Sequence, residues 1–213
     1  MDFSFTDEQK EIQKSVLQLC ASKLNADIFK NDEQAVFPKD KWKMCGQFGI
    51  PGLPVPEEYG GIGQDMLTTG LAIQSLGYGC RDEGLVFSLC AHMLTCVVPV
   101  LYFGTEEQKT TYLPQLCSGE YIGGNGISEA NAGSDVSSMA TTVVKGGGCY
   151  SIKGSKIFVT NGPVADLLVI YAKHTGGMAM LDISAFLIKT THAGFRVGQV
   201  FKKMGLRLSL IHI

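Results

Sequence analysis

The sequence has little charge, no excess of basic residues and no closely paired cysteines. Charged residues make up 18% of the 213 positions, and 18 Lys and Arg stand against 20 Asp and Glu. A protein that holds a nucleic-acid backbone needs a basic surface, so this balance argues against a nucleic-acid partner. Hydrophobic residues make up 45%, which is enough for a buried core and excludes a disordered chain.

The seven cysteines are scattered, and no two of them stand in a C-x-x-C pair. An odd number without such spacing argues against a disulfide framework and against a zinc site. Their apolar neighbours indicate free thiols that pack as small hydrophobic groups. The acidic start of the chain (MDFSFTDE) has neither the basic nor the apolar segment of a targeting peptide. We therefore expect no metal and a reducing, cytoplasmic location.

One apolar stretch, residues 85–103, is long enough to raise the question of a membrane span. It contains Ser88, His92, Thr95 and Pro99, and no basic cluster flanks it. These features favour a buried helix in a helical bundle and no membrane partner. We expect His92 to be a core histidine with one hydrogen bond, because no second ligand stands beside it at metal-binding spacing.

The pattern of apolar residues changes near residue 120. Before it, they recur at helical spacing, and capping boxes formed by Thr6 with Gln9 and by Thr105 with Gln108 predict two helix starts. After it, they alternate or run as in strands. Strands are predicted over residues 141–145, 150–153, 156–160, 167–172 and 185–189, and a weaker one over 195–200, with a GGG turn at 146–148. The pattern predicts an α+β fold, with an N-terminal all-α helical domain (1–120) and an antiparallel β-barrel domain (121–213).

Two short runs carry the functional signal. Residues 127–135 (ISEANAGSD) and 156–162 (KIFVTNG) each end in small hydroxyl, amide and glycine residues. Main-chain N–H groups and hydroxyls in such turns suit a flat, phosphate-bearing cofactor. Alternation along a strand places Phe158 and Thr160 on one face, an aromatic ring beside a hydroxyl. Taken alone, each run also fits an ordinary turn or strand end whose side chains bond their own backbone.

Five segments of the chain, in order, resemble the acyl-CoA dehydrogenase family. They are residues 56–61 (PEEYGG), 103–109 (FGTEEQK), the two runs above and 203–207 (KMGLR). Five ordered matches are far more specific than a single glycine motif. The motifs are most similar to those of short- and branched-chain members such as isovaleryl-CoA dehydrogenase. The resemblance implies an N-terminal helical domain, a middle β-barrel and a C-terminal four-helix domain, the last of which this chain lacks.

The resemblance also implies FAD as cofactor and a reaction that places a double bond between Cα and Cβ of an acyl thioester. A glutamate base takes the α proton while the β hydrogen leaves as hydride to flavin N5. The implied substrates are acyl groups on coenzyme A or on an acyl-carrier protein. An electron-transfer flavoprotein is the implied partner, and the full-length enzyme is expected to be a homo-oligomer.

Residue by residue, the resemblance implies that Ser128 and Thr160 hydrogen-bond the flavin ring and that Phe158 covers one of its faces. Ser134 would meet both the cofactor and the acyl thioester. The sequence departs from the family pattern where Phe158 replaces a frequent Trp, Ala130 replaces a usual Pro and Asn125 replaces an apolar residue. The full set of expected cofactor-binding residues is Asn125, Ile127, Ser128, Gly133, Ser134, Phe158, Val159 and Thr160.

The resemblance ends at Arg207, and the last six residues (LSLIHI) depart from the family. We expect a truncated chain with an incomplete barrel and without the catalytic glutamate. Glu57, Glu58 and Glu129 lie in motifs that do not hold the family base, so no catalytic residue is assigned and the fragment is expected to be inactive. The alternative is a non-catalytic acyl-thioester-binding or scaffold protein. A further enzyme alternative is an oxidase or monooxygenase that uses oxygen.

Overall fold

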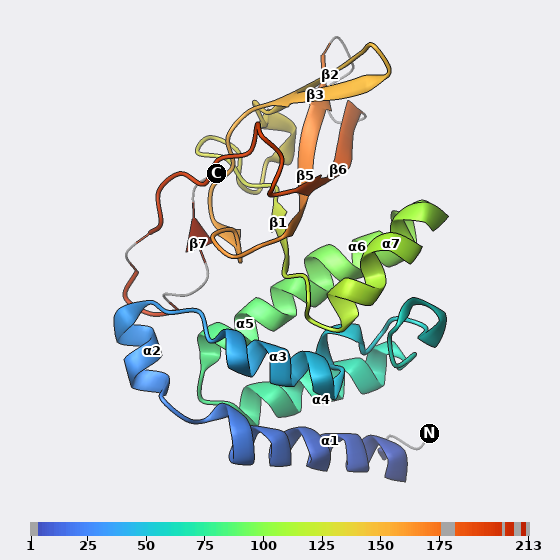
Figure 1. Cartoon of the computed structure of the whole chain (residues 1–213), viewed down its shortest axis with the longest axis vertical. Coiled ribbons are helices and arrows are strands. Elements are labelled where there is room, and N and C mark those ends of the chain that lie inside the picture. Colours follow the sequence, from blue (N-terminus) through green and yellow to red (C-terminus); the bar gives the residue numbers. More distant parts are fainter. Residues whose placement is uncertain (1–3, 176–181, 202, 207–209, 212–213) are drawn as a thin grey trace.

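The computed structural model describes residues 4–175, 182–201, 203–206 and 210–211, with a helical part followed by a sheet (Figure 1). Arg207 and most of the tail that follows it therefore lie outside the described residues. The α-helices are α1 (Asp7–Leu19), α2 (Ile28–Gln34), α3 (Lys39–Phe48), α4 (Met66–Gly79), α5 (Glu83–His92), α6 (Val98–Phe103) and α7 (Glu106–Cys117). Single turns are the π-helices η1 (Cys20–Leu24) and η4 (Met93–Val97) and the 3₁₀ helices η2 (Ile50–Gly52), η3 (Glu57–Tyr59) and η5 (Val136–Ser138).

Both predicted capping boxes are confirmed. The Gln9 amide N–H donates to the Thr6 hydroxyl over 3.2 Å, and the Thr6 N–H donates to the Gln9 side chain over 3.1 Å. Thr105 and Gln108 make the same reciprocal pair at the start of α7. Each box satisfies two of the amide groups that a helix start leaves without a partner, which is why these short signals locate α1 and α7 correctly.

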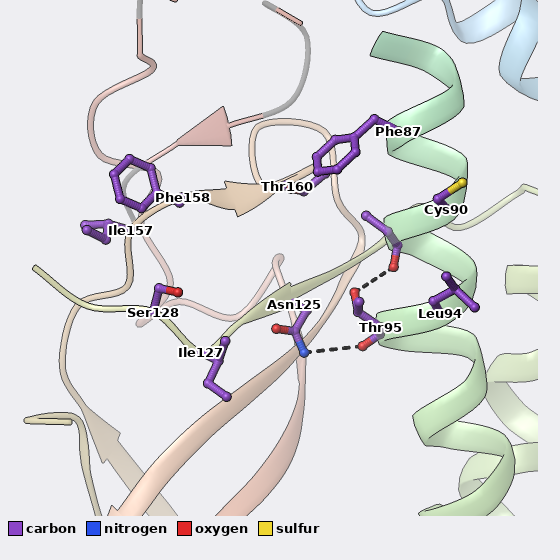
Figure 2. A pocket seen from close by; sticks show the side chains of 11 residues that line it. Phe87, Cys90, Leu94, Thr95, Asn125, Ile127, Ser128, Ile157, Phe158 and Thr160 are labelled. Atoms are coloured by element: carbon purple, nitrogen blue, oxygen red, sulfur yellow. Dashed lines mark hydrogen bonds between the residues drawn. The ribbon is translucent and has the colours of Figure 1, made fainter. Parts of the chain in front are cut away.

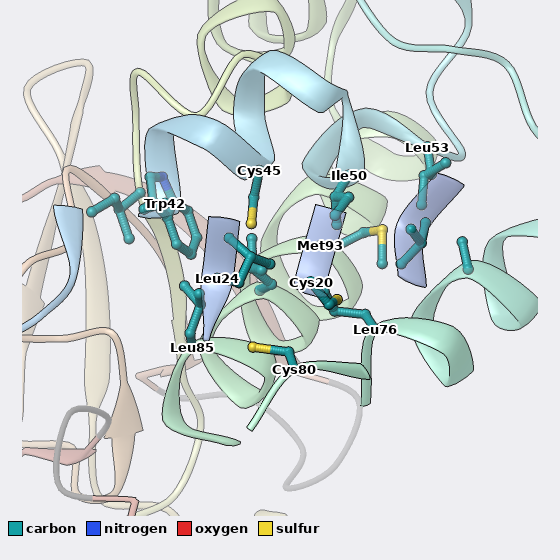
Figure 3. Packing of buried hydrophobic residues seen from close by; sticks show 14 residues of the cluster. Cys20, Leu24, Trp42, Cys45, Ile50, Leu53, Leu76, Cys80, Leu85 and Met93 are labelled. Carbon is teal, nitrogen blue, oxygen red and sulfur yellow. The ribbon is translucent and has the colours of Figure 1, made fainter. Parts of the chain in front are cut away.

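The first core lies among the helices, where side chains from α1, α3, α4 and α5 interdigitate (Figure 3). Trp42 is 2% exposed, and its indole N–H donates to the Gly119 carbonyl over 3.0 Å, so its one polar atom is satisfied. Three buried thiols, Cys20, Cys45 and Cys80, belong to this core. Burial raises the pKa of Cys45 to about 12, so this thiol packs as an apolar group, as expected.

The apolar stretch forms a continuous helical run from Glu83 to Phe103, made of α5, η4 and α6. By length and composition alone this run could cross a membrane. In the structure it packs on α4, α7 and β1 (Gly123–Gly126), and 56% of its apolar window is buried inside the protein. It is therefore a core helix of the fold, with one face left outside the helical core.

The strands are β1, β2 (Thr142–Gly146), β3 (Cys149–Lys153), β4 (Val159–Thr160), β5 (Leu167–His174), β6 (Ile183–Lys189) and β7 (Leu210–Ile211). The predicted hairpin is confirmed as β2 and β3, and Gly147 and Gly148 take the left-handed backbone that its tight turn requires. Among the described residues, no strand forms over 195–200, where only an isolated bridge at Val200 remains.

The prediction of an antiparallel barrel is confirmed only in part. Five described strands form a mixed sheet in the order β1-β5-β2-β3, with β6 also paired to β5, and β4 pairs with β7 in a separate two-stranded sheet. The pairs β2–β3, β5–β6 and β4–β7 are antiparallel. Gly123 pairs in parallel with Leu167, and Thr142 pairs in parallel with Lys173. Long crossovers separate these partners in sequence, so the chain returns to β5 in the same direction. Apolar alternation identifies a strand but carries no information about its direction, which is why the sequence did not predict the parallel pairs.

The helical part and the sheet meet where β1 lies against the long helical run. His92 is fully buried there, its Nδ1 accepts from the Gly123 N–H over 2.7 Å, and its Nε2 donates to the Leu116 carbonyl over 3.1 Å. It is thus a core histidine with two hydrogen bonds where one was expected. A Cβ on Gly123 would lie 2.6 Å from the Cys96 sulfur, so only glycine permits this approach.

We predict that His92 makes the protein less stable in mild acid. Burial lowers the pKa of His92 from 6.5 to about 4. As the pH falls below 6.5, His92 becomes protonated in the unfolded chain but stays neutral in the folded chain. The unfolding free energy therefore falls between pH 6.5 and 4. The slope contributed by one such group is at most about 1.4 kcal/mol per pH unit.

Urea unfolding across that pH range checks this prediction. His92→Gln should flatten the pH dependence, whatever its effect on stability at neutral pH. The matched control, His192→Gln at an exposed histidine, should leave the slope unchanged. An unaltered slope in His92→Gln would contradict the assignment.

Candidate functional site

The two functional runs lie side by side, as expected. The Ile157 N–H donates to the Ser128 carbonyl over 2.9 Å, which joins the runs through their backbones. Lys156 reaches across the same junction, and its Nζ donates to the Ile127 carbonyl over 3.1 Å and to Glu129 Oε1 over 2.7 Å. Residues almost thirty positions apart in sequence are therefore held in one unit.

Glu129 is the centre of this junction, with a side chain that is 8% exposed. Its carboxylate accepts from Lys156, from the Thr141 hydroxyl and from the main-chain N–H groups of Ala140 and Thr141. Burial alone would raise the pKa of Glu129, but these four donors outweigh it and lower the pKa to about 2. A carboxylate held this firmly in its charged form is a poor proton acceptor at neutral pH, so the site uses it as a structural anion.

The first run ends in a turn whose polar groups hydrogen-bond with one another. Glu129 and Ala132 exchange two backbone hydrogen bonds of 2.9 and 3.2 Å, and Asp135 accepts from the Ser137 N–H as the cap of η5. Gly133 and Ser134 are exposed on this turn. Neither of them lines the cavity described next, so their expected cofactor contacts stay predictions.

A cavity of about 290 Å³ lies between the ends of the two runs and the helical run (Figure 2). Five of the eight expected site residues line it, namely Asn125, Ile127, Ser128, Phe158 and Thr160. Val159 lies between two of them, but its side chain is fully buried in the core under the sheet. The structure thus brings together residues of both runs at one cavity.

The cavity offers unused hydroxyls beside an aromatic ring. No described residue forms a hydrogen bond with the Ser128 or Thr160 hydroxyl. The Phe158 ring is 57% exposed and contacts the ring of Phe201, with centroids 5.5 Å apart. These groups can hold one face and two edges of a flat polar ring.

The expected strand over 156–160 is only partly formed, since β4 contains Val159 and Thr160 alone. Phe158 has a φ of 55°, a left-handed backbone that is rare for an aromatic residue. The alternation argument that placed Phe158 and Thr160 on one face is therefore wrong, although both residues do line the cavity. The Phe158 ring is exposed at the cavity, whereas the next side chain, Val159, is buried.

Six lining residues were missed from the sequence: Phe87, Cys90, Ala91, Leu94, Thr95 and Ile157. Five of them follow one helical stripe of the run from Glu83 to Phe103, at spacings of three and four residues. A signal did exist, because this stripe is the face that the helical core leaves partly exposed. The sequence identified the helix but did not show what its second face meets.

We predict that breaking the buried ion pair between Lys156 and Glu129 strongly lowers the stability of the fold. Lys156→Met leaves the Glu129 carboxylate buried without its cation, and we expect a loss of about 3–5 kcal/mol of unfolding free energy. Lys156→Met combined with Glu129→Gln should recover much of that loss, because no charge is then left unpaired. Urea unfolding at pH 7 measures both variants.

The control is Lys14→Met, which breaks an exposed pair with Glu11 and should change stability by less than about 1 kcal/mol. Equal losses in Lys156→Met and Lys14→Met would show that the buried pair does not anchor the junction.

Two family models match the chain. Residues 6–120 match the N-terminal domain of acyl-CoA dehydrogenases, and residues 124–212 match the middle domain. Among curated proteins, an L-prolyl-[peptidyl-carrier protein] dehydrogenase of Pseudomonas fluorescens is 39% identical over 208 residues, or 97% of this chain and 54% of that protein. A short-chain-specific acyl-CoA dehydrogenase of Clostridium acetobutylicum is 40% identical over 209 residues, or 98% of this chain and 55% of that protein.

Solved structures agree with these matches. The prolyl acyl carrier protein oxidase AnaB superposes with a TM-score of 0.94 at 40% identity, covering 98% of this chain and 55% of that one. PigA with FAD and proline gives a TM-score of 0.95 at 38% identity, covering 100% of this chain and 56% of that one. The chain spans about half the length of the relatives that it matches. From the match over residues 6–120 and the shared fold, the chain belongs to the acyl-CoA dehydrogenase family.

Proposed function

We propose that this chain forms the flavin-binding part of an FAD-dependent acyl-thioester dehydrogenase. The observation that supports it is the convergence of Ser128, Phe158 and Thr160, from two separate runs, on one cavity. In this proposal residues 1–120 form the helical domain and residues 121–213 form the sheet domain.

The described residues fit a flavin ring by their donor chemistry. The Ser128 and Thr160 hydroxyls can donate to the polar edge of the ring, and the Phe158 ring can cover one of its faces. Asn125, Ile127 and Val159 contribute main-chain groups at the ends of β1 and β4. Gly133 and Ser134 lie on the exposed turn, from which they would contact the cofactor and the thioester outside the cavity.

When bound, FAD supplies the acceptor for the hydride that leaves the acyl group. The part of the chain that lines the cavity binds and orients, and it moves no proton, because none of the eleven lining residues is an acid, a histidine or a lysine. Glu129 is held as an anion, and Glu57 and Glu58 are exposed on η3. We therefore assign no base among the described residues and expect no dehydrogenase activity from them alone.

The proposed substrate is an acyl group on coenzyme A or on a carrier protein, with an electron-transfer flavoprotein as acceptor and a homo-oligomer as the full-length assembly in the cytoplasm. The second candidate is a non-catalytic protein that binds or displays acyl thioesters. It is favoured by the same observation that leaves the base unassigned, namely a cavity with no titratable side chain among its described lining residues other than Cys90.

Flavin binding tests the proposal. Titration of the 213-residue chain with FAD, followed by quenching of flavin fluorescence, should show saturable binding. Thr160→Val removes one hydroxyl donor, and we expect the dissociation constant to rise about fivefold to tenfold. Phe158→Ala removes the ring face, and a rise of similar size is expected.

Phe29→Ala is the matched control, because Phe29 is another exposed phenylalanine and lies on α2 away from the cavity. It should leave the dissociation constant unchanged. No saturable binding, or equal effects of Phe29→Ala and Phe158→Ala, would reject the flavin site.

A further inference from the structure

Asn161, the residue directly after Thr160, combines three features that are rarely found together. It is polar yet fully buried, and its φ of 64° lies in the left-handed region that few non-glycine residues adopt. Its Oδ1 is buried without a hydrogen-bond partner among the described residues, which costs free energy. Such departures from local preference concentrate at functional sites, where the surrounding structure holds them in place. Asn161 does not line the cavity, so any contribution to the site must pass through its neighbours.

The Asn161 amide joins the three elements that surround the cavity. Its Nδ2 donates to the Ser88 carbonyl of α5 over 3.0 Å and to the Gly123 carbonyl of β1 over 2.9 Å. Carbonyl oxygens cannot donate, so both N–H groups must face them and Oδ1 must face away. Residues from α5, β1 and β4 all line the cavity, and Thr160 is the one from β4 (Figure 2). One side chain therefore ties β4 to the two opposite walls.

The strand that carries Thr160 has limited support of its own. It contains Val159 and Thr160 alone, and its strand partner among the described residues is the equally short β7. Val159 is buried in the core and anchors the strand on one side. A Cβ on Gly124 would lie 2.7 Å from the Thr160 carbonyl oxygen, so β4 and β1 approach as closely as only glycine permits. The Asn161 amide adds the polar contact that connects this tight pair to α5.

We propose that Asn161 is a positioning residue of the flavin site, whose two hydrogen bonds hold Thr160 where its hydroxyl can bond the flavin ring. This inference rests on the proposed function, because Thr160 is a flavin contact only there. Asn161 touches no part of the flavin and acts through Thr160. Hydrogen bonds weaken steeply with distance and angle, so a displaced Thr160 hydroxyl would lose most of its contribution to binding.

A double-mutant cycle tests the inference by FAD titration of the 213-residue chain. In the unaltered chain, Thr160→Val should raise the FAD dissociation constant about fivefold to tenfold. In the Asn161→Gly chain the hydroxyl is no longer held in place, so Thr160→Val should change the constant by less than about twofold. If Asn161 only stabilised the fold, Thr160→Val would keep its full effect in both chains, and that result would overturn the inference.

Two further variants separate the amide from the backbone. Asn161→Gly permits the left-handed backbone, whereas Asn161→Ala disfavours it, and both remove the amide. Both should therefore abolish the effect of Thr160→Val, and abolition in one of them alone would assign the effect to the backbone and refute the proposal.

Ser88→Ala is the matched control in the same buried contact. It removes a hydroxyl that has no hydrogen-bond partner among the described residues and leaves the Ser88 carbonyl in place. In this background Thr160→Val should keep its full effect. A lost effect there would show that any change in the contact disturbs Thr160, which contradicts a specific role for the Asn161 amide.

NMR without FAD separates this inference from the proposed function. The Thr160 methyl signal, identified by its loss in Thr160→Val, should be single in the unaltered chain and broadened or split in Asn161→Gly. If FAD binds but the cycle shows independent effects, the positioning role fails and the flavin site stands. If FAD does not bind, the proposed function fails, and a methyl signal that Asn161→Gly leaves unchanged would show that Asn161 does not fix Thr160 either.

The unaltered chain decides the question if the Asn161 variants do not fold. Both side-chain N–H protons of Asn161 are bonded to buried carbonyls, so they should exchange slowly with solvent and shift when FAD is added. Fast exchange, or signals that FAD leaves in place, would overturn the inference.

Discussion

The packing of β1 against the helical run from Glu83 to Phe103 is the contact on which the rest of the structure depends. It joins the helical part to the sheet, and it is possible only because Gly123 has no side chain. Several of its polar groups are paired inside the contact: His92 bonds both Gly123 and Leu116, and Asn161 donates to the Ser88 and Gly123 carbonyls over 3.0 and 2.9 Å. The Ser88 hydroxyl and the Asn161 amide oxygen are buried there without a hydrogen-bond partner among the described residues. The cavity lies along the same contact, so its walls are held in place by the packing of β1 against the helical run.

The charged groups near this cavity do not line it. The buried Glu129 and Lys156 pair ties the two runs together from behind, whereas the described lining residues carry no formal charge. A firmly anchored anion close to an uncharged cavity lets the backbone be rigid without placing a competing base beside the ligand. In the proposed function these residues would position ligands, and proton transfer would fall to groups outside the described lining.

The sequence predicted most of the local structure and identified Asn125, Ile127, Ser128, Phe158 and Thr160, which line one side of the cavity. The two capping boxes, the GGG hairpin and the long apolar helix were all identified because each signal is contained within a few neighbouring residues. The sheet was wrongly taken as antiparallel, since strand direction depends on the crossovers between β1, β2 and β5. Phe158 lines the cavity, but its left-handed backbone cannot be inferred from alternation, and its expected role at the flavin stays a prediction.

By itself, the sequence determined the helices, the hairpin and the family resemblance, because caps, periodicity and ordered motifs are local chemical facts. Only the tertiary structure decided which face of the helix from Glu83 to Phe103 lies against residues 127–135 and 156–162. It also decided that the buried Glu129 carboxylate is paired with Lys156, and that the Asn125 amide nitrogen donates to the Thr95 carbonyl. These features are contacts between residues that lie far apart in the sequence, and such contacts exist only once packing has closed the chain on itself.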